Sequence, residues 1–396
     1  MGKLTIGLFT DNFRPTVGGT EVVVEKLAEN LSILGHKVYV IAPNKKAECE
    51  DRGCPYTVLR SKALKVFPNT YAGMIALSGK LKKEVNKINF DIIHCHSVEF
   101  FCSYAIKVAK QKDIPLVNTV HTNFRDVYQS IWFMKPISKM LLAKIGKKLN
   151  KSDQIVTVCK NIHQELKSWG VKSEAKVIKN ATCFDYETVC EQSKNVLGLK
   201  DEFVVLYVGR VEPYKNIQFT MQALGLLKDK LNFKFLIVGD GTYTAKLKSL
   251  AKQLGIFEKV KFLGRVDDDK LKQIYARSNL YAIPNKFDTD SLTIIEAAVY
   301  RTPSVVLENT GISERITNNV NGYTIKEDAQ EFADKIFQLA NNLEQTKQVG
   351  LNAFKEIPKT WLDVAKEYES LYNEVLSYYK SKQKCWDSNV KKLDKI

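Results

Sequence analysis

The sequence predicts an α/β protein with two doubly wound domains, and three observations carry this prediction. The chain has 396 residues, which is more than one hydrophobic core usually holds. Short apolar runs rich in strand-forming residues alternate with segments of helical periodicity. The alternation occurs twice, on either side of a weaker pattern at residues 171–201. Apolar strands separated by helices indicate parallel sheets that are covered on both faces.

The first half of the chain begins with a strand and continues with helices and strands in turn. Residues 21–34 have helical periodicity, and the pattern stops at Gly35. The strands expected in this half are residues 4–10, 37–42, 91–95, 116–120 and 154–158. Together they predict an amino-terminal Rossmann-like domain at residues 1–180.

The second half repeats this arrangement, with a helix expected at residues 216–227. Its expected strands are residues 203–208, 233–238, 260–263, 280–283 and 304–307. They predict a second Rossmann-like domain at residues 181–361, joined to the first by a linker near residue 180. Neither half has a Gly-x-Gly-x-x-Gly motif after its first strand, which disfavours a dehydrogenase.

The chain ends in a helical pattern at residues 362–379 and a Lys-rich tail. We expect a terminal helix, at about residues 362–396, that packs back on the first domain. The alternative is an ordinary surface helix followed by a solvated tail.

The composition points to an anionic partner. Lys and Arg total 60 against 44 Asp and Glu, which gives a formal net charge of +16. A phosphorylated substrate, a nucleic acid and an anionic membrane would all suit this excess, and charge alone does not choose among them.

Two further features bear on the compartment. No basic region followed by a long apolar stretch opens the chain, and apolar runs such as 203–208 are too short to cross a bilayer. The eight cysteines form no Cys-x-x-Cys pair, so zinc and redox motifs are disfavoured and small core residues are favoured. These features predict a cytoplasmic protein.

Loops after the first strand of each half carry the polar residues of interest. Gly18 and Gly19 stand just before a helix, where backbone can approach a ligand and free N–H groups can meet an anion. A plain tight turn is the alternative. Arg210 and Lys215 flank one loop in the second half, where both can reach a diphosphate, although most basic loops are merely solvated.

Three more segments end strands at the same expected edge of the second sheet. Gly239 and Gly241 form a further turn, and the backbone at Arg265 and Val266 can pair with a nucleotide base. Residues 284–297 form an acidic loop that leads into a helix starting near Ser291.

Three acids of this last segment are assigned different tasks. Glu296, about one turn into the helix, can accept hydrogen bonds from two vicinal hydroxyls. Asp288 lies in the loop and can reach another polyol. For Asp290 we favour stabilisation of the helix dipole.

In their order along nearly the whole chain, these motifs resemble the family 4 glycosyltransferases, which have the GT-B fold. They are the Gly-Gly loop at 18–19, the loop from Gly209 to Asn216, the turn at 239–241 and the acid–seven–acid segment. The resemblance implies two Rossmann-like domains facing across a cleft. The amino-terminal domain would bind the acceptor, and the carboxyl-terminal domain would bind a nucleotide sugar.

The resemblance also implies a retaining transfer that needs no metal and no other cofactor. Arg210 and Lys215 would hold the donor diphosphate, helped by backbone around Ser291 and Leu292, and Glu296 would bind the ribose. Asp288 occupies the place of the motif's first Glu, which contacts the transferred sugar. This Asp and Ser291, which replaces the usual Gly, depart from the family pattern, so they leave the donor identity open.

Histidines mark the corresponding edge of the first domain. His121 follows the strand at 116–120, where the family places a His near the reacting centre; capping of the strand end is the alternative. His96 and Asn123 are candidates for the acceptor side. His94 and His96 resemble a metal pair, but no third ligand is evident and we expect no metal.

Two Lys-rich segments, 60–87 and 135–151, and the tail around Trp386 combine positive charge with apolar residues. Basic helices with an apolar face can lie on an anionic bilayer, as in the bacterial diacylglycerol and glycolipid glucosyltransferases that this chain resembles. Alternatively, two amphipathic helices pack their apolar stripes on the sheet and leave the lysines solvated.

The function expected from these features is transfer of a hexose, glucose by the family's commonest usage, from a UDP-sugar to a membrane lipid or glycolipid. The enzyme would lie peripherally on the inner face of the membrane. A polysaccharide, a protein and a soluble molecule stay open as acceptors. The ordered motifs disfavour an epimerase or a phosphorylase of similar architecture. A nucleic-acid-binding protein is disfavoured because no clustered basic and aromatic motif is present and the acidic loop would be unexplained.

Overall fold

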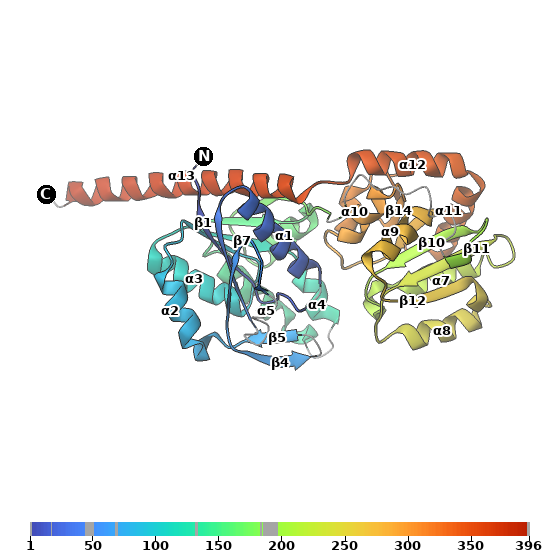
Figure 1. Cartoon of the computed structure of the whole chain (residues 1–396), viewed down its shortest axis with the longest axis horizontal. Helices are drawn as coiled ribbons and strands as arrows, with labels where there is room; N and C mark the ends of the chain where they lie inside the picture. The colour runs from blue at the N-terminus through green and yellow to red at the C-terminus, as the bar shows by residue number, and fades with distance from the viewer. Residues whose placement is uncertain are drawn as a thin grey trace. The chain divides into compact units, whose positions relative to one another are not determined.

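The computed structural model describes residues 2–16, 18–43, 51–67, 70–130, 134–182, 184 and 197–393, and Figure 1 labels its elements. The chain divides into two compact units. Unit 1 comprises Met1–Asn180 and Thr360–Ile396, and unit 2 comprises Ala181–Lys359. Each unit is built on its own parallel sheet with Rossmann-like topology.

The sheet of unit 1 has the strand order β3-β2-β1-β6-β7-β8-β9, and its paired strands run parallel. Its strands are β1 (Thr5–Phe9), β2 (Lys37–Ala42), β3 (Thr57–Arg60), β6 (Ile92–Cys95), β7 (Leu116–Val120), β8 (Gln154–Thr157) and β9 (Ala175–Val177). The helices are α1 (Gly19–Ile33), α2 (Gly79–Lys87), α3 (Phe100–Lys112), α4 (Phe124–Ser130), α5 (Ser138–Leu149), α6 (Lys160–Ser168) and α13 (Trp361–Leu393). Helices α2 and α3 share a core with Phe9 and Ile93, so the central strands are apolar throughout rather than alternating.

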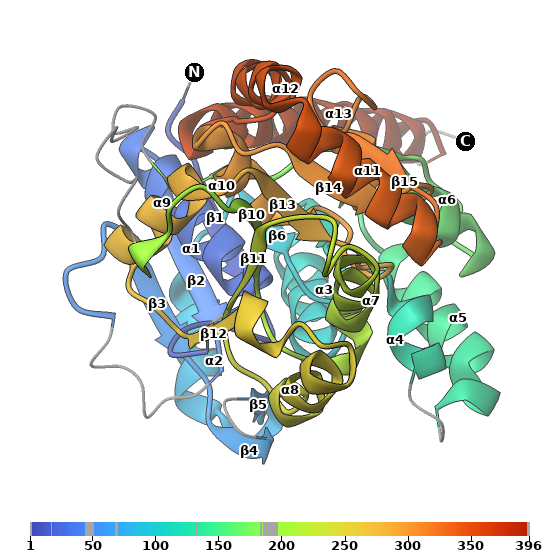
Figure 2. The same ribbon diagram turned by 90° about the vertical axis from the view of Figure 1, so that its right-hand side faces the viewer.

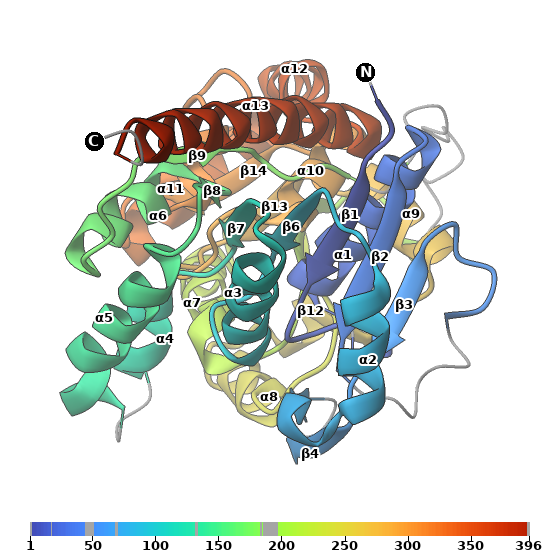
Figure 3. The same cartoon turned by 90° about the vertical axis from the view of Figure 1, so that its left-hand side faces the viewer.

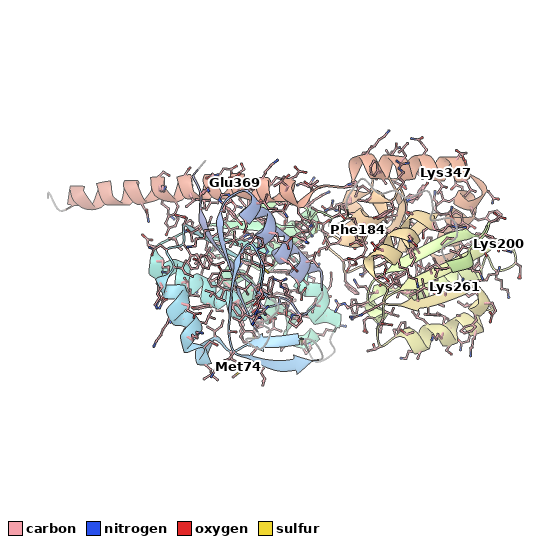
Figure 4. All side chains as sticks on the ribbon, in the orientation of Figure 1. Met74, Phe184, Lys200, Lys261, Lys347 and Glu369 are labelled. Atoms are coloured by element: carbon pink, nitrogen blue, oxygen red, sulfur yellow. The ribbon has the colours of Figure 1, made fainter. Side chains whose placement is uncertain are left out.

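Helix α13 packs on unit 1 beside α1, as Figure 3 shows. Glu369, labelled on α13 in Figure 4, lies 3.1 Å from the buried His36 (Oε1 to Nε2). Farther along the helix, the Tyr379 hydroxyl donates a hydrogen bond of 2.9 Å to Asp113. The helix is therefore attached to unit 1 over several turns.

The sheet of unit 2 has the order β12-β11-β10-β13-β14-β15. Its strands are β10 (Phe203–Val208), β11 (Phe233–Val238), β12 (Val260–Gly264), β13 (Leu280–Ile283), β14 (Ser304–Leu307) and β15 (Tyr323–Ile325). The helices are α7 (Ile217–Gly225), α8 (Thr244–Gln253), α9 (Asp268–Arg277), α10 (Leu292–Val299), α11 (Ala329–Asn341) and α12 (Leu343–Glu356). Figure 2 shows these elements from the side on which they face the viewer. The strand order reverses between β10 and β13, and ligands of such sheets bind where the order reverses.

All ten strands expected from the sequence are present, with ends that differ by at most one residue. The terminal helix α13 ends at Leu393, in agreement with the helix expected at about residues 362–396, although the helical pattern itself ends at residue 379. Strands β3, β9 and β15 were not anticipated. They are four, three and three residues long, too short to show a reliable periodicity.

The basic segment 60–87 corrects one expectation, because most of it is not helical. It forms an antiparallel hairpin, β4 (Ala63–Phe67) and β5 (Thr70–Gly73), then a short 3₁₀ helix (Ile75–Leu77) and α2. Branched and aromatic residues in this stretch favour strands over a helix. The segment 135–151 contains a 3₁₀ turn and α5, as an amphipathic helix requires.

The apolar stripes of the two basic helices face the interior of unit 1. Leu81 and Val85 of α2 and Leu142 and Ile145 of α5 are buried. This packing agrees with the alternative in which both helices bury their apolar stripes and leave their lysines solvated. Large apolar side chains near both helices nevertheless stay exposed. Of the helices in the described ranges, none is both long and apolar enough to cross a bilayer.

The cysteine expectation is confirmed where the structure describes the side chains. Cys95, Cys102 and Cys159 are buried core residues, and Cys54 is half-buried. Cys49, Cys183, Cys190, the side chain of Cys385 and the tail side chains around Trp386 lie outside the described residues.

Candidate active site

The loops after β10 and β11 of unit 2 pack backbone against backbone. Gly209 and Gly239 have φ values of 150° and 121°, which side-chain-bearing residues rarely adopt. A Cβ at Gly239 would lie 2.0 Å from the carbonyl oxygen of Gly209, and one at Gly241 would lie 2.1 Å from that of Val211. The glycines therefore serve loop packing, in addition to any approach of a ligand.

A salt bridge joins the loops after β10 and β13, where the strand order reverses. Lys215 Nζ donates to both carboxylate oxygens of Asp288, at 2.7 Å and 2.9 Å. Asn216 Nδ2 adds a hydrogen bond of 3.1 Å to the carbonyl oxygen of Pro284. Two residues that the sequence placed at the donor phosphate and the donor sugar thus contact each other directly.

Arg210 belongs to the same cluster of side chains. Its guanidinium carbon lies 5.9 Å from the ring centre of Tyr214, and Lys215 Nζ lies 5.6 Å from the same ring. Arg210 is exposed, so its fork of donors is accessible to an anion. The structure therefore brings the two expected phosphate-binding cations together on one aromatic side chain.

The start of α10 is tied to β10 and β13 by hydroxyl groups. The buried Tyr281 hydroxyl lies 3.2 Å from the carbonyl oxygen of Val208 and 2.5 Å from Thr293 Oγ1. Ser291 Oγ is 2.8 Å from the same Thr293 oxygen. Ser291 is the residue before the helix, and Leu292 is its first residue. These contacts fix the helix terminus whose N–H groups the sequence assigned to phosphate.

Asp290 needs a correction. We assigned it to the helix dipole, but the first turn of α10 contains no acid, and the Asp290 carboxylate pairs with Arg315 through two hydrogen bonds. Asp290 therefore holds the loop after β14 against the acidic loop. Gly311 of that loop also requires close packing, since a Cβ there would lie 2.8 Å from the Thr289 carbonyl oxygen.

Glu296 on α10 lies among buried aromatic side chains. Its Oε2 accepts a hydrogen bond of 2.9 Å from the hydroxyl of Tyr275 on α9. Burial raises the pKa of Glu296 to about 7, against the opposing effect of this hydrogen bond. The carboxyl group therefore changes charge near neutral pH.

The remaining donor-side candidates follow β12. The Gly239 N–H donates a hydrogen bond of 2.8 Å to the Gly264 carbonyl oxygen. This bond joins the loop after β11 to the loop after β12. Arg265 is exposed and Val266 is half-buried.

Unit 1 contains a pocket of about 190 Å³ at the carboxyl ends of β1, β6 and β7. Its lining includes the two expected histidines, His96 and His121, and Thr20 of α1. His96 Nδ1 lies 2.9 Å from His121 Nε2. Burial lowers the pKa of His121 to about 4 and, together with the neighbouring imidazoles, holds that of His96 well below its usual range. Both rings are therefore neutral at physiological pH.

Two other sequence candidates are placed less directly. Asn123 is buried, and its side-chain oxygen accepts a hydrogen bond of 3.2 Å from the backbone N–H of Arg125. This bond stabilises the amino-terminal end of helix α4. Gly18 precedes α1 with an extended backbone, and a Cβ at Gly19 would meet nothing within 4 Å. A Cβ at Gly19 would therefore point into open space, next to Thr20 of the pocket lining.

Sequence reasoning missed several polar residues near the two sites. Asp11 lines the unit 1 pocket, and its carboxylate accepts from the N–H groups of Phe101 and Glu99. Tyr368 and Tyr372 of α13 contact the histidine cluster from below the pocket. Their spacing along a helix is typical of core residues, so only the position of the helix reveals the contact.

The His94–His96 pair has partners other than a metal. His94 is fully buried and lies within 2.7 Å of the hydroxyls of both Tyr372 and Thr119. Within the described parts of the chain, no group of three His, Cys, Asp or Glu side chains is arranged to hold a metal ion.

The buried histidines should make unit 1 sensitive to acid. Burial lowers the pKa values of His94, His96 and His121 below the ordinary 6.5, so the unfolded chain binds more protons between about pH 6.5 and pH 4. The free energy of unfolding should therefore be highest above pH 6.5 and should decrease as the pH falls toward 4. His121 alone should contribute about 3 kcal/mol to this decrease.

Tryptophan fluorescence can follow this loss during urea unfolding, because all four tryptophans belong to unit 1. The variant His121→Gln should lose less stability between pH 7.5 and pH 5 than the wild type. An equal loss in both would contradict the assignment.

Comparison with known proteins supplies the family. Residues 17–183 match the model of Glycosyltransferase Family 4, and residues 190–356 match that of Glycosyl transferases group 1. The alpha-monoglucosyldiacylglycerol synthase of Acholeplasma laidlawii is 24% identical, over 99% of this chain and 100% of the relative. The N-acetyl-alpha-D-glucosaminyl L-malate synthase of Bacillus anthracis is 25% identical, over 94% and 98%.

Solved structures share the fold. The Anabaena protein HepE, solved in complex with UDP-glucose, has a TM-score of 0.74 at 20% identity and covers 95% of this chain and 100% of its own. Together with the two family models and the two Rossmann-like units, this likeness establishes that the chain belongs to the family 4 glycosyltransferases of the GT-B fold.

Proposed function

We propose that this glycosyltransferase moves glucose from UDP-glucose to a hydroxyl of a membrane lipid, diacylglycerol or a glycolipid, with retention of the anomeric configuration. The observation that carries the proposal is the Lys215–Asp288 salt bridge where the strand order of unit 2 reverses. It places a cation suited to a diphosphate beside an acid suited to a sugar hydroxyl.

The donor would be held by the loops of unit 2. Arg210, Lys215 and the amino terminus of α10 neutralise the diphosphate in the role that a metal has in other transferases. Glu296 accepts hydrogen bonds from the ribose hydroxyls, and Asp288 receives one from the sugar. The complex of HepE with UDP-glucose supports a donor of this class.

The chemistry needs separation of charge and a hydroxyl nucleophile. The bond between the anomeric carbon and the diphosphate oxygen breaks, and the acceptor oxygen bonds to the same face of the sugar. The acceptor proton passes to the departing phosphate. The fixed cations favour the negative leaving group, and His121, neutral at physiological pH, accepts hydrogen bonds at the reacting centre.

The pocket of unit 1 supports an uncharged acceptor group. Asp11 and Glu99 line it, and no Lys or Arg is among the described residues that line it; Lys148 contacts the carbonyl oxygens of Val98 and Glu99 beside the pocket. Burial and the nearby Asp11 raise the pKa of Glu99, and an anion there would raise it further. A glycerol or sugar hydroxyl fits this setting better than a carboxylate such as the malate in the name of the Bacillus relative.

The membrane side of the proposal rests on exposed apolar residues among lysines. Leu64 is 61% exposed on the β4–β5 hairpin, and Met140 is 51% exposed on α5. Met74, labelled in Figure 4, follows the hairpin. Lys80 is exposed on α2, and Lys139 is exposed on α5 beside Met140. An anionic bilayer would cover both kinds of side chain.

Vesicle flotation tests the membrane surface. The chain should float with vesicles that contain anionic lipid at low salt and should be released at high salt. The double variant Leu64→Ser/Met140→Ser should float less, with Leu226→Ser of unit 2, also exposed, as the matched control. Failure of the wild type to bind at low salt would favour a soluble or polymeric acceptor.

A panel of nucleotides tests the donor. UDP should raise the melting temperature of the chain, GDP should do so less, and oligonucleotides should have no effect. A rise with oligonucleotides alone would contradict the transferase site in unit 2 and favour a nucleic-acid partner.

The affinity for UDP should depend on the charge of Glu296. Because the pKa of Glu296 is about 7, its carboxylate fraction, and with it the affinity, should increase about tenfold from pH 6 to pH 8. Calorimetric titration at both values measures this. The diphosphate titrates in the same range, so the variant Glu296→Gln supplies the reference. An equal increase in the variant would remove the ribose role from Glu296.

A further inference from the structure

Three imidazole rings form a row at the unit 1 pocket, in which His96 and His121 line the pocket and His94 lies behind them. The ring centres of His94 and His96 are 4.0 Å apart, and those of His96 and His121 are 5.2 Å apart with nearly parallel planes. His96 and His121 are also joined by the nitrogen-to-nitrogen contact of 2.9 Å. His94 lies on β6, His96 follows the end of β6, and His121 follows β7.

Helix α13 holds the buried end of this row. The Tyr372 hydroxyl lies 2.7 Å from His94 Nδ1, and Thr119 Oγ1 lies 2.7 Å from His94 Nε2. Tyr368, one turn before Tyr372, reaches the same Thr119 oxygen at 3.2 Å. Both ring nitrogens of His94 are thus engaged, so its orientation is fixed from α13 and β7.

The charge states in this network follow from burial. Burial keeps His94 neutral, so it carries one N–H and one acceptor nitrogen. Burial also raises the pKa of Tyr372 far above its usual value, so its hydroxyl stays protonated and can donate to Nδ1. In the tautomer in which Nδ1 accepts from Tyr372, Nε2–H of His94 donates to Thr119 Oγ1, which also lies 3.2 Å from the Tyr368 hydroxyl.

We propose that Tyr372 and His94 are positioning residues for His121, so that α13 completes the candidate active site of unit 1. The Tyr372 hydroxyl fixes the ring of His94, the ring of His94 supports that of His96, and His96 Nδ1 holds His121 Nε2. This inference rests on the proposed function, in which His121 contacts the reacting groups.

A purely structural role leaves one atom unexplained. His96 Nε2 is buried and has no hydrogen-bond partner among the residues that the structure describes, although His96 lines the pocket. A buried polar atom without a partner is costly unless a ligand or water supplies one. The contacts from Tyr372 of α13 to His94, and from His94 to His96, therefore lead to His96 Nε2, which is suited to contact a bound hydroxyl.

Charged and titratable groups from every neighbouring element must be considered in a pH profile. Asp11 comes from the loop after β1 and Glu99 from the loop before α3, and Lys148 of α5 donates from its Nζ to the carbonyl oxygens of Val98 and Glu99. Tyr368 and Tyr372 come from α13. The acids lie at the pocket, whereas the tyrosines contact the other end of the row. A change at Tyr372 therefore reaches His121 through the imidazoles.

The test is Tyr372→Phe, with Tyr379→Phe as the matched control. Both remove one hydroxyl from α13, but that of Tyr379 bonds Asp113 on the surface. UDP release from UDP-glucose with diacylglycerol vesicles should show kcat lowered about tenfold in Tyr372→Phe, with UDP affinity unchanged. The control should match the wild type.

Spectra of the imidazole nitrogens separate positioning from folding. The chain has only five histidines, so ¹⁵N-labelled imidazoles can be resolved. Tyr372→Phe should shift the His121 signals and its pH titration. Unchanged His121 signals, or a kcat equal to that of the control, would overturn the proposal. If Tyr372→Phe does not fold, Tyr368→Phe tests the same network from Thr119 under the same criteria.

The activity of His121→Ala distinguishes a failure of the proposed function from a failure of the positioning role of Tyr372 and His94. If His121→Ala transfers glucose as the wild type does, the proposed role of the unit 1 pocket fails. If His121→Ala is impaired while Tyr372→Phe and Tyr368→Phe are not, only the positioning role fails.

Discussion

Replacing Lys215 with alanine should lower glycosyl transfer by about 10²–10³-fold, the cost of removing one fixed group that stabilises developing charge. Lys215 is little exposed and held by two hydrogen bonds to Asp288, so its charge is already oriented before a donor arrives. The variant should also lose the rise in melting temperature with UDP, because the diphosphate loses a principal cation.

The matched control for this variant is Lys286→Ala. Lys286 lies in the same acidic loop but pairs with Glu327 and is about half exposed. It should keep transfer and UDP binding near wild-type values. If Lys215→Ala also binds UDP normally, the donor site is assigned to the wrong loops.

The variant His121→Ala should lower transfer by about a hundredfold or more while UDP affinity stays unchanged, as expected when a fixed hydrogen-bonding group at the reacting centre is lost. His121 belongs to unit 1, whereas the side chains assigned to the diphosphate and the ribose of UDP, those of Arg210, Lys215 and Glu296, belong to unit 2. Turnover and nucleotide binding should therefore respond separately. Kinetics with saturating UDP-glucose and calorimetry with UDP measure the two.

A second histidine serves as the control for that substitution. His163 on α6 pairs with Glu174 and bonds the Ala175 carbonyl oxygen, away from the pocket lining. His163→Ala should transfer as the wild type does. Equal losses in both variants would point to damage of unit 1 as a whole, and the role of His121 would have to be withdrawn.

The sequence predicted the sheets well because parallel strands covered on both faces are continuous apolar runs, as in Phe203–Val208. It predicted short edge strands poorly, because three residues such as Tyr323–Ile325 carry no usable period. The residues of the hairpin β4–β5 suggest a helix on sequence alone, because lysines mixed with apolar residues are compatible with both structures. Intrinsic strand preference then decided the outcome.

The candidate sites were predictable as lists of residues but not as contacts. Lys215 and Asp288 are 73 positions apart, and only the reversal of strand order between β10 and β13 brings them together. Asp290 was assigned to the helix dipole because its partner Arg315 lies in a different loop. Tyr372 could not be connected with His94, because a helix 278 residues downstream supplies it.

Transfer of a labelled sugar tests the central claim most directly. The purified chain would be incubated with UDP-glucose labelled with ¹³C at the anomeric carbon and with anionic vesicles that contain diacylglycerol. We predict a lipid-extractable glucoside whose anomeric signal has the α configuration of the donor, formed by the wild type and by Lys286→Ala but not by Lys215→Ala. A β-configured product, or label that stays in UDP-glucose with the wild type, would contradict the account.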